Sequence, residues 1–187
     1  YYSSANHSST TTVKLKDGDN HIISGNIIYL GNQILVMEGV SNCLVNNNYL
    51  SSTDSGASWQ ISSSDNNIIE NNTLVDSHYG MWVSNSDYNT IWTNIIYNHS
   101  LNGYETNSYF NNWNISDIGN FWGDLEENSG YSSGYYTISG TGAGIDWHPS
   151  PLATDDESEP LSVRVFEILN DPNQPYSCSA WGNQYAN

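Results

Sequence analysis

A short phrase recurs along this chain at a nearly fixed interval. An Asn or an aromatic residue is followed after three positions by an apolar residue, after six by Asn and after eight by a second aliphatic residue. The phrase occurs at Asn20-Ile23-Asn26-Ile28, Asn42-Val45-Asn48-Leu50, Asn66-Ile69-Asn72-Leu74, Tyr88-Ile91-Asn94-Ile96 and, in a weaker form, Phe110-Trp113-Ser116-Ile118, at spacings of 22, 24, 22 and 22 residues. A fixed period of this length indicates stacked supersecondary units, each of which packs mainly on its neighbours.

Each unit is predicted to be a coil of short strands. The period is too short for a helical hairpin repeat, and no segment carries an apolar stripe at helical spacing. Apolar and polar residues instead alternate, as at Met81 and Val83, which is typical of a strand with one buried face. Ser, Asn, Gly and Asp lie between these strands and favour turns.

The same alignment places Asn residues in two columns. When equivalent turns stack about 4.8 Å apart, a buried Asn can bond the equivalent Asn above and below it, which satisfies an amide that is costly to bury without a partner. One predicted ladder consists of Asn26, Asn48, Asn72 and Asn94, and the other of Asn67, Asn89 and Asn111.

Three stretches of the sequence resemble a known family. The phrases SDNNIIENNTL, SDYNTIWTNII and GNFWGD, within residues 17–152, are similar to the parallel β-helix repeats of NosD-like and related carbohydrate-binding or sugar-hydrolase surface proteins, which are often found in archaeal envelopes. The resemblance implies an all-β fold, a right-handed parallel β-helix (β-solenoid) of about five rungs of 22–24 residues. The family includes enzymes, binding proteins and scaffolds, so the function has to be inferred from the residues of this chain.

Composition divides the chain into five segments. They are an N-terminal segment (1–16), the β-helix rungs (17–118), a Gly- and aromatic-rich C-terminal cap (119–152), an acidic linker (153–160) and a tail (161–187) in which residues 161–168 alternate like a strand. A cap of this kind covers the open backbone of the last rung, which would otherwise template further strands.

Basic residues are almost absent. Lys14, Lys16 and Arg164 stand against 20 acidic residues, and the net charge is −17. Nucleic acid is therefore excluded as a partner, and an anionic membrane surface is disfavoured. No apolar run is long enough for membrane insertion, and the chain begins at Tyr1 without Met or a signal-like segment. We expect a processed protein that is secreted and lies in the extracellular space or at the cell-envelope surface.

Two kinds of covalent modification fit such a location. Glycosylation sequons begin at Asn6, Asn71, Asn98 and Asn114, all in predicted turns or loops. Cys43 lies in the second Asn column and Cys178 in the tail. Three states stay open for these cysteines, namely a disulfide within the chain, a disulfide between chains, and a free, buried Cys43.

Catalysis is not expected. The rungs contain no basic residue for a polysaccharide-lyase mechanism, and glycosidases need two carboxylates roughly 5 to 10 Å apart. Asp65 and Asp87 form the candidate pair, since the position equivalent to Glu70 in the next rung is Trp92. Both Asp residues precede an Asn turn, where a carboxylate serves turn geometry.

Two metal sites are considered. Asp124, Glu126 and Asn128 supply oxygen atoms at alternate positions, as at the start of a calcium loop, although Ser129 replaces the usual Gly and no acid follows at the twelfth place. His78 and His99 lie about one rung apart, and the resemblance to NosD-like proteins links such a pair to copper. Solvated turn histidines are the simpler interpretation. No cofactor is expected other than this possible calcium ion.

The aromatic residues suggest a glycan-binding alternative. Trp82 and Trp92 point outward by alternation, and an exposed row of such rings would stack on sugars. The favoured hypothesis is nevertheless structural, because a solenoid of only five rungs gains stability from further copies stacked against it. We predict a secreted protein that assembles with itself into an extracellular sheath, surface layer or filament. A carbohydrate-binding module is the alternative, and a glycoside hydrolase-like or NosD-like copper-associated protein is the second alternative.

Overall fold

The computed structural model describes residues 11–29, 31–52 and 56–150. The chain divides into two compact units, Tyr1–Leu152 and Ala153–Asn187. The second unit lies outside the described residues, and with it the acidic linker, the predicted strand at 161–168 and Cys178. The predicted pairing of Cys43 with Cys178 therefore stays a prediction.

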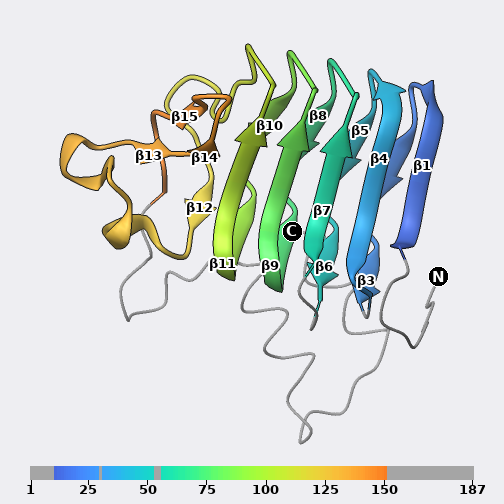
Figure 1. Ribbon diagram of the computed structural model, residues 1–187, viewed down its shortest axis with the longest axis horizontal. Coiled ribbons are helices and arrows are strands. Elements are labelled where there is room, and N and C mark those ends of the chain that lie inside the picture. Colours follow the sequence, from blue (N-terminus) through green and yellow to red (C-terminus); the bar gives the residue numbers. More distant parts are fainter. Residues whose placement is uncertain (1–10, 30, 53–55, 151–187) are drawn as a thin grey trace, which may run out of the picture. The chain divides into compact units, whose positions relative to one another are not determined.

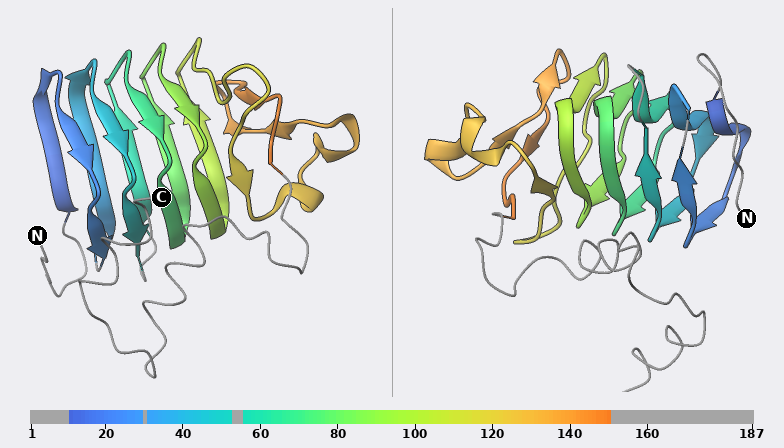
Figure 2. Two further views of the ribbon diagram at one scale, coloured as in Figure 1. Left: turned by 180° about the vertical axis from the view of Figure 1, so that it is seen from behind. Right: turned by 90° about the horizontal axis from the view of Figure 1, so that it is seen from below.

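The first unit is a parallel β-solenoid. Its coils follow one another from the N-terminal end to the cap, as Figures 1 and 2 show. The strands are β1 (Thr11–Asp19), β2 (Ile22–Ser24) and β3 (Ile27–Tyr29); β4 (Gln33–Ser41), β5 (Leu44–Asn46) and β6 (Tyr49–Ser51); β7 (Ala57–Ser62), β8 (Ile68–Glu70) and β9 (Thr73–Ser84); β10 (Thr90–Trp92), β11 (Ile95–Thr106) and β12 (Phe121–Trp122). β9 and β11 each turn a corner, so that one strand ends a coil and begins the next.

Two parallel sheets form the walls. The larger follows the order β1-β4-β7-β9-β11-β12, with β3 and β6 at its side, and the smaller follows β10-β8-β5-β2. Every pairing among these strands is parallel. The predicted all-β parallel solenoid of about five coils is thus confirmed. Within the described residues, no helix has the length and apolar character needed to cross a membrane.

The core consists of side chains stacked in register from coil to coil. The four columns are Val13, Leu35, Trp59 and Met81; Leu15, Met37, Ile61 and Val83; Ile23, Val45, Ile69 and Ile91; and Ile28, Leu50, Leu74 and Ile96. Most of these side chains are fully buried, and those of the first coil are partly exposed. Burying an aliphatic side chain of this size contributes about 1.5–3 kcal/mol, so each added coil stabilises its neighbours.

Asn amides stack beside the core in the same register. In the first column, the backbone N–H and the Nδ2 group of each Asn donate to Oδ1 of the Asn one coil later, over 2.9–3.0 Å. This ladder contains Asn26, Asn48, Asn72, Asn94 and Asn120. The second ladder connects Asn67, Asn89 and Asn111, and the backbone N–H of Cys43 donates to its first member.

A third ladder, of serines, was not predicted from the sequence. The hydroxyl oxygens of Ser64, Ser86 and Ser108 each accept a hydrogen bond from a backbone N–H in the preceding coil. All three serines are fully buried. A buried hydroxyl needs such a partner, and here it receives one from every coil.

The last coil differs from the predicted repeat. Asn94 bonds to Asn120, 26 residues later, and Ile96 pairs with Trp122, so Ser116 and Ile118 do not occupy the predicted columns. The extra residues form a surface loop in which Ile115 and Ile118 pair with each other. The coil therefore continues beyond the predicted boundary at residue 118. At the other end, β1 begins at Thr11, ahead of the predicted boundary at residue 17.

The cap follows Trp122. It contains the 3-10 helices η1 (Leu125–Glu127) and η2 (Tyr131–Ser133) and the strands β13 (Tyr136–Thr137), β14 (Ser139–Gly140) and β15 (Ile145–Asp146). Trp122 stacks on Tyr136 with ring centroids 4.1 Å apart and planes 3° apart, and it also packs against Trp113. β14 pairs with β11, so the cap continues one edge of the larger sheet.

Replacing a central member of the Asn ladder should destabilise the fold far more than replacing its first member. Asn72→Ala leaves the buried N–H groups of Asn48 and the carbonyl of Val45 without a partner, so we expect a loss of about 3 kcal/mol in the free energy of unfolding. Asn26→Ala, at the exposed end of the ladder, is the matched control and should cost less than about 1 kcal/mol. Equilibrium denaturation in urea measures both values, and equal losses would contradict the ladder's role.

Candidate functional site

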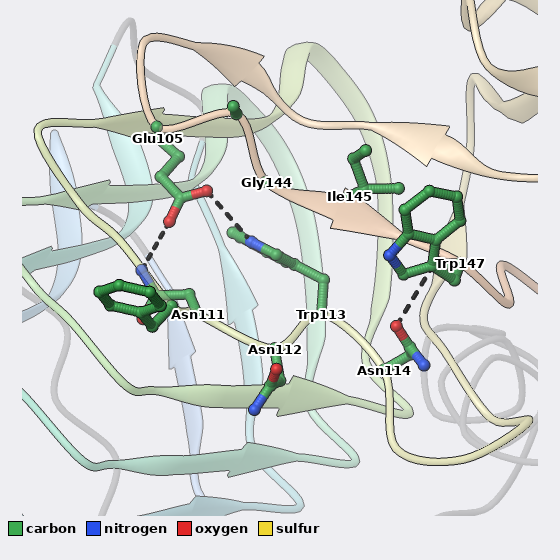
Figure 3. Close-up of a pocket in the computed structure, with 11 residues that line it drawn as sticks. Glu105, Asn111, Asn112, Trp113, Asn114, Gly144, Ile145 and Trp147 are labelled. Carbon is green, nitrogen blue, oxygen red and sulfur yellow. Dashed lines mark hydrogen bonds between the residues drawn. The ribbon is translucent and has the colours of Figure 1, made fainter.

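A groove lies where the fifth coil meets the cap. It has a volume of about 260 Å³, close to the lower end of the range typical of small-ligand sites. Its lining residues come from the end of β11, the turn after it and the cap segment around β15, namely Glu105, Phe110, Asn111, Asn112, Trp113, Asn114, Gly142, Ala143, Gly144, Ile145 and Trp147. Figure 3 shows this arrangement.

Two exposed aromatic rings border the groove. Phe110 is 71% exposed and Trp147 is 56% exposed. Phe110 stacks on Tyr88 of the previous coil with ring centroids 5.2 Å apart and planes 12° apart, so one of its faces is covered. Trp147 packs against Tyr135 of the cap, with ring centroids 5.4 Å apart. Each ring is thus held by a second ring while it remains open to solvent.

The backbone at Phe110 is unfavourable for an aromatic residue. Five equivalent turn residues have left-handed backbone, with φ between 56° and 61°, and they are Asn20, Asn42, Asn66, Tyr88 and Phe110. Asn adopts this conformation readily, whereas a bulky side chain does so at a cost of about 1 kcal/mol or more. The last two coils therefore carry exposed rings at positions where Asn would suit the fold better.

Glu105 lies at the base of the groove in a core position. The register places it directly after Leu15, Met37, Ile61 and Val83 in one apolar column. It is only 1% exposed. A carboxyl group here replaces an aliphatic side chain that would stabilise the core, and burying it is costly unless it is hydrogen-bonded.

Three N–H groups point at the carboxylate of Glu105. Nδ2 of Asn111 donates to Oε1, Nε1 of Trp113 donates to Oε2 over 3.3 Å, and the backbone N–H of Gly144 also donates. Burial raises the pKa of Glu105 above its usual value, and these hydrogen bonds oppose the rise. Because all three partners are donors, the ionised carboxylate is the form that fits them.

The cap passes very close to this carboxylate. A Cβ atom at Gly144 would lie 2.1 Å from Oε2 of Glu105, and one at Gly142 would lie 2.4 Å from its Cγ. No side chain fits in that space, so these two glycines allow the cap to close over Glu105.

Asp146 ends the first Asn ladder in a similar way. Its Oδ2 accepts from the backbone N–H and Nδ2 of Asn120 and from Nε1 of Trp122, and its Oδ1 accepts from the backbone N–H of His148. Burial raises the pKa of Asp146. Both Asn ladders thus end on a buried carboxylate, Asp146 for the first and Glu105 for the second.

The two tryptophans predicted to bind glycans lie on different walls. Trp82 belongs to β9 of the larger sheet and packs against Tyr79 and Tyr104, whereas Trp92 belongs to β10 of the smaller sheet. Both are half-buried. They do not form one row, and the exposed rings of the groove come from turn and cap positions instead.

The candidate catalytic pair serves the turns. Oδ1 of Asp65 accepts from the backbone N–H of Asp87, and Oδ1 of Asp87 accepts from the backbone N–H of Tyr109, both over 2.7 Å. The two carboxylates therefore hold successive turns together, as the turn interpretation expects.

The predicted calcium ligands do not converge. Oδ1 of Asp124 accepts from Asn102 and from the hydroxyl of Tyr136, while Oδ1 of Asn128 accepts from the backbone N–H groups of Gly130 and Thr137. Glu126 is exposed on η1. Among the described residues, no three or more His, Cys, Asp or Glu side chains are grouped so that they could hold a metal ion.

The predicted glycosylation sites differ in accessibility. Asn71 and Asn98 are exposed at turns with positive φ. Asn114 is half-buried beside the groove, where its Oδ1 accepts from the backbone N–H of Trp147. Asn6 lies outside the described residues.

The comparison with protein families matches most of the solenoid. The sequence model described as periplasmic copper-binding protein (NosD) matches residues 3–127, from before β1 to the end of η1. The chain belongs to the NosD family. No curated protein and no solved structure matches it. The resemblance inferred from the repeat phrases is therefore confirmed.

The described residues of this NosD-family chain do not offer a copper site. The register places Ser77, not His78, opposite His99. Nδ1 of His99 accepts from the backbone N–H of Ser77, and its Nε2 donates to the carbonyl oxygen of Leu74, so both ring nitrogens are engaged. Burial lowers the pKa of His99, which favours this neutral form. Cys43 is buried, and its Sγ donates to the carbonyl of Ser41.

The Glu105→Gln variant should alter the pH dependence of stability. The fold raises the pKa of Glu105 above the ordinary value of 4.5, so its contribution to stability is fully present below that pH and is lost as the pH rises through the raised value. The free energy of unfolding of the parent, relative to that of the variant, should therefore fall between about pH 4 and pH 7. All other groups titrate in both proteins and cancel. A difference that is constant across this range would show that Glu105 is not perturbed by burial.

Proposed function

We propose that this chain is an extracellular or envelope protein that binds a glycan in the groove. The observation that carries the proposal is the pair of exposed rings, Phe110 and Trp147, on either side of a groove whose base is polar. The family, described as periplasmic, and the net charge of −17 support a location outside the cytoplasm. Neither ring contributes to the core, and Phe110 has an unfavourable backbone conformation.

The groove has the chemistry that sugars require. Aromatic faces bind the apolar face of a sugar ring, and amide side chains bond to its hydroxyl groups. Asn112 is exposed in the groove between the two rings. Glu105 is the one carboxylate in the lining, whereas a glycosidase uses two, so binding rather than hydrolysis is proposed.

Replacing Phe110 with Asn should separate binding from folding. Asn is the residue of the first three coils at this turn, so Phe110→Asn should leave the free energy of unfolding unchanged or raise it by up to about 1 kcal/mol. The same change removes one wall of the groove and should weaken glycan binding at least about tenfold, or 1.4 kcal/mol. Glycan arrays followed by calorimetry measure binding, and urea denaturation measures stability.

Trp147→Ala should have a comparable effect on binding. Tyr131→Ala is the matched control, because Tyr131 is an exposed ring of the cap outside the groove. It should leave the affinity unchanged. The proposal fails if no glycan binds the parent chain, or if Tyr131→Ala weakens binding as much as Trp147→Ala does.

Self-assembly into a sheath, surface layer or filament is the second candidate. The observation that favours it is the edge of β1, which pairs with β4 and with no second strand among the described residues. A strand from another copy, such as residues 161–168, fits such an edge in principle. At the other end, the two ladders end on carboxylates, so a further copy cannot continue them there.

Assembly is tested on the native chain. Light scattering across a range of salt and calcium concentrations should show oligomers, and electron microscopy of the source material should show an ordered layer or filament. Gels with and without reductant report whether the cysteines join chains. A monomer under all of these conditions would exclude this candidate and leave glycan binding unaffected.

A further inference from the structure

The negative charge at the groove has no cationic partner. Residues 17–163 contain no Lys or Arg, and the two lysines of β1 are engaged with Glu38. The three groups that hold the Glu105 carboxylate are neutral N–H donors, which stabilise its charge without cancelling it. The charged group that acts on Glu105 from the preceding coil is Asp87, which is also negative.

We infer that the groove selects a sugar that carries a free amino group. This inference rests on the proposed glycan binding and adds the class of ligand. An ammonium group between the two exposed rings and above Glu105 supplies the positive charge that the described part of the chain lacks there. A uronic acid in the same place would add a third negative charge to Glu105 and Asp87.

Two physical effects favour the amine in the groove. An ammonium group over the face of an aromatic ring is stabilised by about 0.5–2 kcal/mol, and Phe110 and Trp147 each leave ring surface exposed. The attraction between the ammonium group and Glu105 is stronger than in bulk water, because Trp113 and the cap exclude solvent from the carboxylate. An N-acetylated sugar of the same shape keeps the ring stacking and loses both effects.

The geometry also explains why a carboxyl group occupies this position. A fifth aliphatic residue in the column of Val83 would have packed without the need for Gly142 and Gly144. Hydrogen bonding to Asn111 alone does not require a charge, since an amide oxygen ends such a contact equally well. What a carboxylate adds is its charge, and the groove is where that charge reaches a ligand.

The test compares two ligands that differ only in the amine. Oligomers of glucosamine and of N-acetylglucosamine, of equal length, are titrated into the full chain by calorimetry at about pH 6, where amines are protonated and carboxyl groups are usually ionised. The parent should bind the glucosamine oligomer at least about tenfold more tightly. Raising the salt concentration should reduce this ratio only modestly, because a partly buried pair is screened less than a surface pair.

Two variants identify the source of the preference. Glu105→Gln should bring the ratio of the two affinities to about one and keep the affinity for the N-acetylated oligomer. Glu126→Gln, an exposed carboxyl of the cap that does not line the groove, removes the same overall charge and should keep the full preference. A ratio of one in the parent, or an undiminished preference in Glu105→Gln, would overturn the inference while glycan binding itself stood. Failure of both oligomers and of all other glycans to bind would instead overturn the proposed function.

A measurement on the parent chain avoids any effect of substitution on folding. The carbon resonance of the Glu105 carboxyl group should shift on titration with the glucosamine oligomer. It should shift much less with the N-acetylated oligomer. Equal shifts with the two ligands would contradict the inference even if Glu105→Gln fails to fold.

Discussion

The structure depends on one hydrogen bond that is repeated in register, from the amide and backbone of one Asn to Oδ1 of the Asn in the next coil. Side-chain amides are the groups that can accept and donate in the same plane, so each member satisfies its neighbour on both sides. The ladder fixes the vertical alignment of the coils, because a shift by one residue would leave a buried amide unpaired in every coil. The apolar columns then follow the same alignment, and four of them fill the narrow space between the walls.

Much of this fold was predictable because the period and the columns are written directly in the sequence. The Asn positions and the buried aliphatic positions follow from a spacing of 22 to 24 residues. The prediction went wrong in the fifth coil, where extra residues enter the surface loop and a fixed count no longer finds the column. The pair Asn120 and Trp122 repeats the relation of Asn94 to Ile96, and this local pattern was the available signal.

The groove was harder to predict, for physical reasons that differ among its residues. Glu105 lies 22 residues after Val83, so the period alone placed a carboxyl group in an apolar column. The role of Phe110 depends on its φ angle and on its contact with Tyr88, which the alternation of the sequence does not contain. Trp147 belongs to the cap, where no repeat relates one residue to another. Function in a repeat protein is thus concentrated where the repeat is broken, since the regular coils already use their polar groups on each other.

The two carboxylates that close the ladders have a further consequence for how such chains change over evolutionary time. A carboxylate accepts hydrogen bonds and donates none, so Asp146 and Glu105 set the last coil wherever they follow it. An additional unit of about 22 residues inserted between two earlier coils would meet the same neighbours above and below and would leave the cap and the groove unchanged. The length of the solenoid and the chemistry of its end can therefore vary independently, which allows one binding end to be carried at different distances from the opposite end of the chain.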